Sequence, residues 1–403
     1  MRFFLTIPLF GLLASAGLFF ADLQTVMYWD TPSTAAVVHL LLLGVAGMAM
    51  VGALFQMLPV IAGAAIKEPR YHAFWIHLLM AAGTLMLVCA LYFDIYILLH
   101  PAMLLLVGSL GFVVYLMLGK LLGVENKTPS VKGMILSVSS LGAGVFVAIL
   151  LTLSFMGVDL GLDPSVLRSV HVHFMLPGWI GILVMAVAFQ VIEMFYVTPP
   201  YPKAVTSFFP PALFLLLLLN VVFSSLFAAI VPFLDLAIAL VFAGFGIVTI
   251  RRLMQRKRPV ADATVWFWRL SMGSLVLSSI LAALSSFGDF SGLFFASALL
   301  FGYFVLSVIF AMSYKIVPFL VWFHLNAKGV MQTPMMGDII PAKKAMWHLW
   351  IHLVLLAAGL VLVVTPYGWK MIAALLAAEF LLYGANLVRA MRIYQSLKDK
   401  GIL

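Results

Sequence analysis

Stretches of about 20 apolar residues recur along this chain, and this recurrence restricts its fold more than any other feature. A helix of about that length crosses roughly 30 Å of hydrocarbon, and no gap between the stretches could hold a soluble domain. Twelve spans are predicted, at residues 3–22, 34–63, 73–93, 96–119, 133–157, 168–195, 206–229, 231–250, 266–287, 291–319, 345–365 and 369–390. The sequence therefore predicts an all-α, polytopic bundle, with residues 1–403 forming a single integral membrane domain.

Charged residues are scarce and lie mainly between the spans. They make up 9% of the chain, whereas a soluble domain has roughly 25%. Of the 23 Lys and Arg residues, 21 lie at the termini or in loops that follow even-numbered spans, with Arg168 and Lys370 as the exceptions. The opposite loops carry aspartates: Asp22, Asp30, Asp94, Asp159, Asp163, Asp235 and Asp289. The positive-inside rule then places both termini in the cytoplasm, and a bacterial inner membrane is the expected location.

Three further features limit the functional classes. The net charge of +9 arises from loops such as RRLMQRKR at 251–258, so nucleic acid is not an expected partner. Residues 1–20 resemble a secretory signal, but a retained first helix is the favoured interpretation. Cys89 is the only cysteine, which excludes an intrachain disulfide and a cluster of thiolate ligands.

The second, sixth and tenth spans share a sequence pattern. The second reads VHLLLLGVAGMAMVGALFQMLP and the sixth VHFMLPGWIGILVMAVAFQVIE, and equivalent residues differ in number by 134. The matched pairs are His39 and His173, Gly44 and Gly178, Gly47 and Gly181, and Gln56 and Gln190. The tenth span continues the pattern at AMSYKIVPF, with Ala298 at the histidine position and Lys315 at the glutamine position. WIHL also recurs at 75–78 and 350–353. We therefore predict three four-helix units with pseudo-threefold symmetry; chance similarity among apolar segments is the alternative.

Imidazoles on these spans are candidate ligands. His171 and His173 point about 200° apart on a helix, so they face different neighbours. Under the predicted topology His39, His171 and His173 all lie within about two turns of the outer surface. Gly44, Gly47, Gly178 and Gly181 lack side chains just beneath, which predicts a slot for a planar macrocycle. Imidazole is a common axial ligand of haem iron, whereas a hydrogen-bonded structural histidine is the alternative at each position.

Other polar residues within the spans are weaker candidates. His348 and His352 are four residues apart, a spacing that suits a metal pair, and His77 matches His352 in the WIHL repeat. All three begin near the cytoplasmic face, so interfacial structural roles are favoured. Gln56, Gln190 and Lys315 predict a polar cluster near that face, with Glu193 neutralising Lys315. Glu379 is a mid-span carboxyl group that must be protonated, hydrogen-bonded or paired.

The layout of twelve spans in three units, with histidines on the second and sixth, resembles subunit I of haem–copper oxidases and nitric-oxide reductases. The segment HVHFMLPGWIGILVMAVAFQVI is similar to the HxH helix of C-type (cbb) oxidases. The resemblance implies that His39 and His173 hold a low-spin haem b and that His171 faces a second haem site. Arg168 then pairs with a propionate, or alternatively with lipid phosphate. NnrS-type proteins, twelve-span haem proteins linked to nitric-oxide stress, are the better comparison.

The chain departs from the oxidases where their chemistry is carried. Their HxH pair lies on the tenth helix, and the seventh span here, SFFPPALFLLLLLNVVF, has no histidine to bind copper. Copper and oxygen reduction are therefore not expected. The expected function is a haem b protein, with one or two haems, that transfers electrons with a cytochrome or quinol or responds to nitric oxide or another diatomic gas. Oxidoreductase activity is left open. The expected surroundings are a lipid bilayer, with a second copy or an associated membrane subunit as a partner. The alternatives are a membrane transporter for haem, copper or protons and a non-catalytic assembly subunit.

Overall fold

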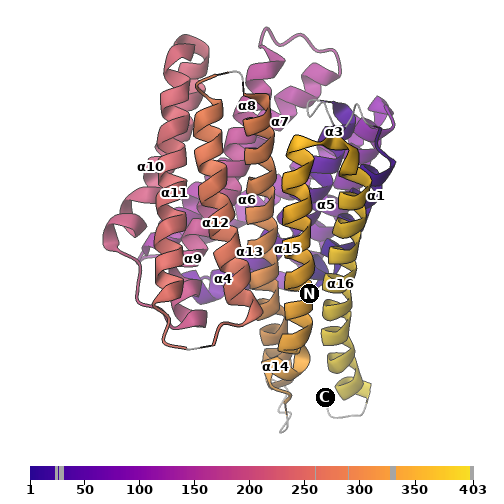
Figure 1. The fold of residues 1–403 in the computed structure, drawn as a ribbon, viewed down its shortest axis with the longest axis vertical. Helices are drawn as coiled ribbons and strands as arrows, with labels where there is room; N and C mark the ends of the chain where they lie inside the picture. The colour runs from indigo at the N-terminus through magenta and orange to yellow at the C-terminus, as the bar shows by residue number, and fades with distance from the viewer. Residues whose placement is uncertain (23–25, 27–30, 259, 289, 327–332, 400–403) are drawn as a thin grey trace. The chain divides into compact units, whose positions relative to one another are not determined.

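The computed structural model describes residues 1–22, 26, 31–258, 260–288, 290–326 and 333–399, and these residues contain helices and no strand (Figure 1). Asp30, Asp289, Lys328 and Lys400, which enter the charge count above, lie outside the described residues. The elements are α1 (Arg2–Phe20), α3 (Pro32–His39), η1 (Leu40–Gly47), α4 (Met48–Ala62), α5 (Pro69–Tyr92), η2 (Tyr96–Leu98), α6 (Leu99–Leu122), α7 (Pro129–Phe155), α8 (Pro164–His173), η3 (Phe174–Gly181), α9 (Ile182–Tyr196), α10 (Lys203–Leu226), η4 (Ala228–Ile230), α11 (Val231–Met254), α12 (Ala263–Ser285), α13 (Ser291–Asn326), α14 (Met336–Ile339), α15 (Ala342–Val364), η5 (Pro366–Gly368) and α16 (Trp369–Asp399).

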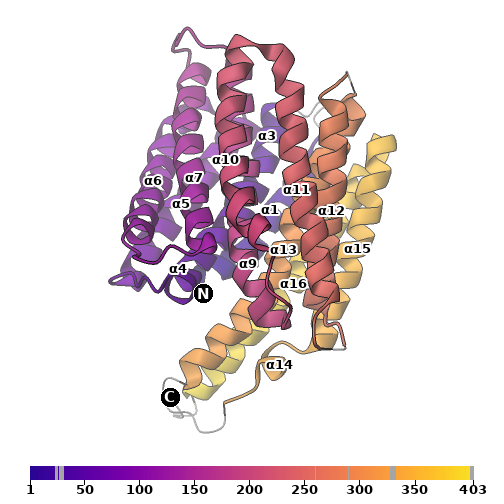
Figure 2. The same cartoon turned by 90° about the vertical axis from the view of Figure 1, so that its left-hand side faces the viewer.

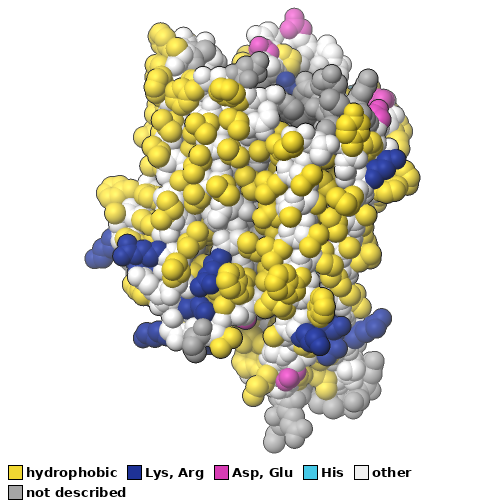
Figure 3. All heavy atoms as spheres, viewed as in Figure 1, with side chains coloured by type: hydrophobic (Ala, Val, Ile, Leu, Met, Phe, Trp, Pro, Cys, Tyr) yellow, Lys and Arg dark blue, Asp and Glu magenta, His cyan; other side chains and the backbone are white. Residues whose placement is uncertain are grey.

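Within the described residues, twelve helices are long and apolar enough to cross a membrane, which confirms the predicted all-α fold and number of spans. Three of them are composite: Pro32–Ala62, Tyr96–Leu122 and Pro164–Tyr196 each join successive helical segments. Hydrophobic side chains cover most of the face drawn in Figure 3, as expected for helices that contact lipid. The arrangement in three four-helix units stays a prediction.

Proline and a capping side chain begin several of these helices. Thr31, Thr128 and Asp163 each precede a proline, and each side chain accepts a hydrogen bond from a backbone N–H of the first turn. Proline suits the first helical position because its missing N–H would have no intrahelical partner. The N–H of Ser165 bonds the Asp163 carboxylate at 2.8 Å, and this bond holds the pKa of Asp163 below its usual value. Short loops thus end in well-defined helix starts.

The described chain forms two compact units. Unit 1 comprises residues 1–53, 260–271 and 303–403, and in it α1 packs along α16. A Cβ atom on Gly11 would overlap the ring of Phe380, and one on Gly384 would lie 3.1 Å from Pro8. Close approach of these two helices therefore depends on bare backbone on both sides. In the same unit, α15 packs against α16.

Unit 2 comprises residues 54–259 and 272–302. Within it α7 packs against α8, η3 and α9, and α10 lies beside α11 (Figure 2). The Ser137 hydroxyl on α7 donates to the carbonyl of Trp179 in η3 at 2.8 Å. Across the same contact, a Cβ on Gly178 would lie 2.8 Å from Cβ of Ser140. Small residues and one hydroxyl thus join α7 to the widened segment η3.

Two of the spans change from α-helix to π-helix at equivalent positions. The π-helical segment η1 begins directly after His39, and η3 begins directly after His173; each is eight residues long. Their residue numbers differ by the same 134 that relates the two sequences. A π-helical turn is rare and is often found at functional sites. The similarity of the second and sixth spans therefore extends to their backbone geometry.

We predict that Gly11→Ala destabilises the protein while Gly108→Ala does not. The new methyl group at residue 11 must displace the Phe380 ring, and such overpacking costs about 1–3 kcal/mol. Gly108 lies on the exposed side of α6, where a Cβ meets no atom within 4 Å, so alanine's helix propensity favours the variant by up to about 1 kcal/mol. Thermal unfolding in detergent compares the two variants; equal midpoints would contradict the packing described for α1 and α16.

Candidate functional site

His39 and His173 hold the same local hydrogen bond. Nδ1 of His39 lies 2.7 Å from the carbonyl oxygen of Ala35, and Nδ1 of His173 lies 2.8 Å from that of Ser169. A carbonyl oxygen only accepts, so the proton is on Nδ1 in both rings. In the neutral ring the lone pair is then on Nε2, which is the form of imidazole that binds a metal. The donor chemistry of both residues fits an axial ligand.

The two histidines of the HVH segment face different helices, which confirms the expectation from their spacing. Nδ1 of His171 donates to the carbonyl of Gly144 on α7 at 3.0 Å. Nε2 of His173 instead lies 3.5 Å from the carboxylate of Asp235 on α11. That carboxylate also accepts from Asn220 at 2.9 Å and from Ser286 at 3.1 Å. Asn220 and Ser286 therefore fix the position of the Asp235 carboxylate, and a protonated His173 would pair with it.

The glycines predicted to line a macrocycle slot contact neighbouring helices. A Cβ on Gly44 would overlap Phe10, and one on Gly181 would overlap Phe242. Gly178 meets Ser140, as described above, and Gly47 is buried in η1. At Gly44, Gly178 and Gly181 the space is thus filled by protein, so these glycines serve close helix packing and do not fit a cradle for a macrocycle. Arg168 is exposed on α8.

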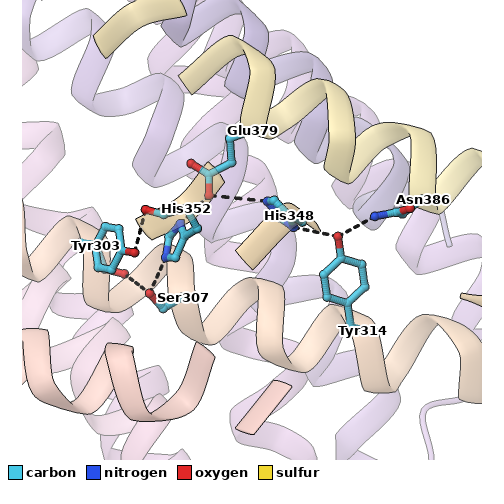
Figure 4. A network of polar contacts seen from close by, with 7 residues as sticks. All are labelled: Tyr303, Ser307, Tyr314, His348, His352, Glu379 and Asn386. Carbon is cyan, nitrogen blue, oxygen red and sulfur yellow. Dashed lines mark hydrogen bonds and ion pairs between the residues drawn. The ribbon is translucent and has the colours of Figure 1, made fainter. Parts of the chain in front are cut away.

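A group of ionisable side chains lies inside unit 1, between α13, α15 and α16 (Figure 4). His348 and His352 on α15 and Glu379 on α16 are all 0% exposed. Protein therefore encloses both rings, while their predicted depth near the cytoplasmic face stays a prediction. His77, the WIHL equivalent of His352, is half-buried on α5 in unit 2. The structure brings Glu379 together with His348 and His352, to which the sequence pattern had not connected it.

One end of this group is a chain of hydrogen bonds through Tyr314. The amide of Asn386 donates to the Tyr314 hydroxyl at 2.9 Å. That hydroxyl lies 2.7 Å from Nδ1 of His348 and donates its own proton there. The proton of a neutral His348 is then on Nε2, which points at the Glu379 carboxylate across 3.5 Å. The hydrogen bonds donated by Asn386 and Tyr314 and the N–H of His348 thus follow one direction, which ends at the Glu379 carboxylate.

The other end of the group holds His352 at both ring nitrogens. Nδ1 bonds the Glu379 carboxylate directly, and Nε2 lies 2.7 Å from the Ser307 hydroxyl. The ring stacks on Tyr303, with centroids 3.9 Å apart and planes inclined by 14°. The Tyr303 hydroxyl donates to the backbone carbonyl of His352 at 2.8 Å. His352 is thus held at four points.

Aromatic rings separate the group from other polar atoms. Phe310 packs edge-on against His348 at 4.4 Å between centroids. Phe267 lies 5.4 Å from the ring of His348 and 5.2 Å from that of His352. Two atoms inside this enclosure have no hydrogen-bond partner: Oε2 of Glu379 and Nε2 of His348. Among the described residues, no group of three or more His, Cys, Asp and Glu side chains is arranged to hold a metal ion.

Lys315 pairs with Asp262 in unit 1, a partner that the sequence analysis did not identify. Its Nζ lies 2.7 Å from the carboxylate, which also accepts from the Thr264 hydroxyl and the Val265 N–H. Burial opposes ionisation of Asp262, but these hydrogen bonds and the Lys315 charge outweigh it and lower its pKa. Glu193, the expected partner of Lys315, lines a pocket of about 230 Å³ in unit 2 with Gln190 and Tyr201.

Sequence reasoning missed the hydroxyl-bearing and amide members of the buried group, although their spacing carried a signal. Tyr303 and Ser307 are four residues apart on α13, and Glu379, Tyr383 and Asn386 follow at intervals of four and three on α16. Residues at such intervals share one face of a helix. His348 and His352 form a third such polar face, on α15. Polar faces on three apolar spans indicate that these faces pack against one another inside the protein.

Comparison of the sequence with protein-family models and with curated proteins finds no match to either.

We predict that acid destabilises the protein in part through Asp262. Its folded-state pKa lies below the ordinary value of 3.8, so the ion pair contributes fully above that value and is lost as the pH falls through the folded-state pKa. The carboxylate is 44% exposed, and solvent screening limits the effect to about 1 kcal/mol. Unfolding midpoints measured against pH should fall less steeply below about pH 4 in Asp262→Asn than in the wild type; identical slopes would contradict the assignment.

Proposed function

We propose that this chain is a membrane haem b protein in which the imidazoles of His39 and His173 would bind haem iron. The observation that supports it is the match between these residues: each donates Nδ1–H to the carbonyl four residues earlier, and each directly precedes an eight-residue π-helical segment. Such a bond fixes the tautomer and orientation of a metal-binding histidine. The two histidines are thus prepared for metal binding by the same local geometry.

Each of the candidate residues would have a separate role. His39 and His173 would hold the iron, His171 would face a second haem or a gas-binding position on the α7 side of its helix, and Arg168 would pair with a propionate. A haem with two imidazole ligands supplies one-electron transfer. Asp235 would set the state of His173, because a protonated ring pairs with the carboxylate and cannot donate a lone pair.

The finer biological setting belongs to the same proposal. The Lys and Arg residues that follow the even-numbered spans support a bacterial inner-membrane protein with both termini in the cytoplasm. Electrons would come from a cytochrome or quinol, and a diatomic gas such as nitric oxide is the favoured ligand of any five-coordinate haem. The three-unit arrangement related to haem–copper oxidases, and assembly with a second copy or another membrane subunit, are further parts of the proposal.

The purified, full-length protein should show the absorption bands of reduced low-spin haem b. We expect His39→Ala and His173→Ala each to remove these bands, since one imidazole leaves the iron without its second axial ligand. His324→Ala is the matched control: Nδ1 of His324 also bonds the carbonyl four residues earlier, at 2.7 Å, but the described residues that follow it, up to Asn326, are α-helical. The control should retain the bands. A colourless wild-type protein after expression with haem supplied, or bands unchanged in both alanine variants, would refute the proposal.

A further inference from the structure

The buried group in unit 1 suggests a second activity. We propose that Glu379 and His352, assisted by His348, form a site that binds and releases one proton inside the membrane-spanning part of the chain. The site shares no residue with the proposed haem ligands and does not depend on them. It would supply the proton step of a transport or redox cycle in the membrane.

The hydrogen bonds define where the proton is. The Ser307 hydroxyl donates to the carbonyl of Tyr303 at 2.7 Å, so its oxygen can only accept from Nε2 of His352. With Nε2 protonated, the proton between Nδ1 and the Glu379 oxygen is the one that moves. It is on His352 in an imidazolium–carboxylate pair, or on Glu379 beside a neutral ring. In both forms the pair has no net charge.

The transfer itself is simple. The N–H bond at Nδ1 of His352 breaks, an O–H bond forms at Oε1 of Glu379, and the electron pair of the old bond remains on the ring nitrogen. Release of that proton leaves a net negative charge on the carboxylate, and the nearby Nε2–H of His348 is placed to stabilise it. His348 stays in this orientation because Tyr314 and Asn386 hold its other nitrogen.

A purely structural role does not account for the unpartnered oxygen of Glu379. A buried polar atom without a hydrogen bond is costly, and Oε2 of Glu379 has none. Buried ion pairs seldom stabilise a protein more than apolar residues of the same volume would. Ionisable residues inside a membrane span commonly mark proton and ion pathways.

The ligand is a proton rather than a metal cation. His352 and Glu379 are in direct hydrogen-bond contact, which leaves no room for an ion between these two groups. Apart from the two histidines, the titratable groups that face the site are three phenols, Tyr303, Tyr314 and Tyr383. Phenols ionise near pH 10 and remain neutral in the range where an imidazole and a carboxyl exchange a proton.

Infrared difference spectra of the full-length protein, recorded between about pH 5 and pH 9, test the proposal. The wild type should show a carboxyl band that appears or disappears with pH and shifts in D₂O. Glu379→Gln should remove this band. Asp262→Asn, which changes a carboxylate outside the buried group, should leave it in place.

A pair of tyrosine variants tests the site without removing the carboxyl group. Tyr314→Phe deletes the donor to His348, so the midpoint of the Glu379 band should move by about 1 pH unit. Tyr383→Phe is the matched control, because this buried hydroxyl bonds Ser313 at 2.8 Å and not the chain leading to Glu379; its midpoint should not change. A band that is absent from the folded wild type, or retained in Glu379→Gln, overturns the proposal. If Glu379→Gln fails to fold, an unchanged midpoint in Tyr314→Phe does so.

Discussion

Hydrocarbon offers no hydrogen bonds, so every polar atom within a span must find its partner in the protein. Many side chains of this molecule meet the requirement locally. The hydroxyls of Ser15, Thr84 and Thr249 each donate to the carbonyl four residues earlier, at 2.7–2.8 Å. His39 and His173 use Nδ1 in the same way. A helix that carries such residues can face lipid or another helix without a penalty.

The group around Glu379 obeys the same constraint differently, because a carboxylate cannot donate to its own helix. It is satisfied only by side chains from α15, and these are in turn satisfied by α13 and by Asn386. One acidic side chain therefore helps to orient residues of two other helices: Tyr314 through His348, and Ser307 through His352. Oε2 of Glu379 and Nε2 of His348 nevertheless have no hydrogen bond. The rings of Phe267, Phe310 and Tyr303 pack closely around the two histidines.

Hydropathy was sufficient to predict the twelve spans, because the length of an apolar run is a local property of the sequence. The opposite directions of His171 and His173 were also predictable, since helix geometry alone determines them. The partners of Glu379 were not, because they depend on which faces of α13, α15 and α16 meet. Depth along a span placed His348 and His352 near the cytoplasmic face but did not indicate whether lipid, water or protein surrounds them. The glycines illustrate the same limit: a missing side chain indicates close approach, and only the fold shows that Phe10 and Phe242 are the approaching groups.

The tenth span lacks the π-helical turn that follows His39 and His173 in the second and sixth spans. By the register of the sequence repeat, Ala298 replaces the histidine there, and Tyr303 occupies the position of Gly44 and Gly178. The backbone remains α-helical through this part of α13, and the Tyr303 ring lies flat against His352. The tenth span thus carries, at the position of a glycine in the second and sixth spans, an aromatic ring that packs on a buried histidine.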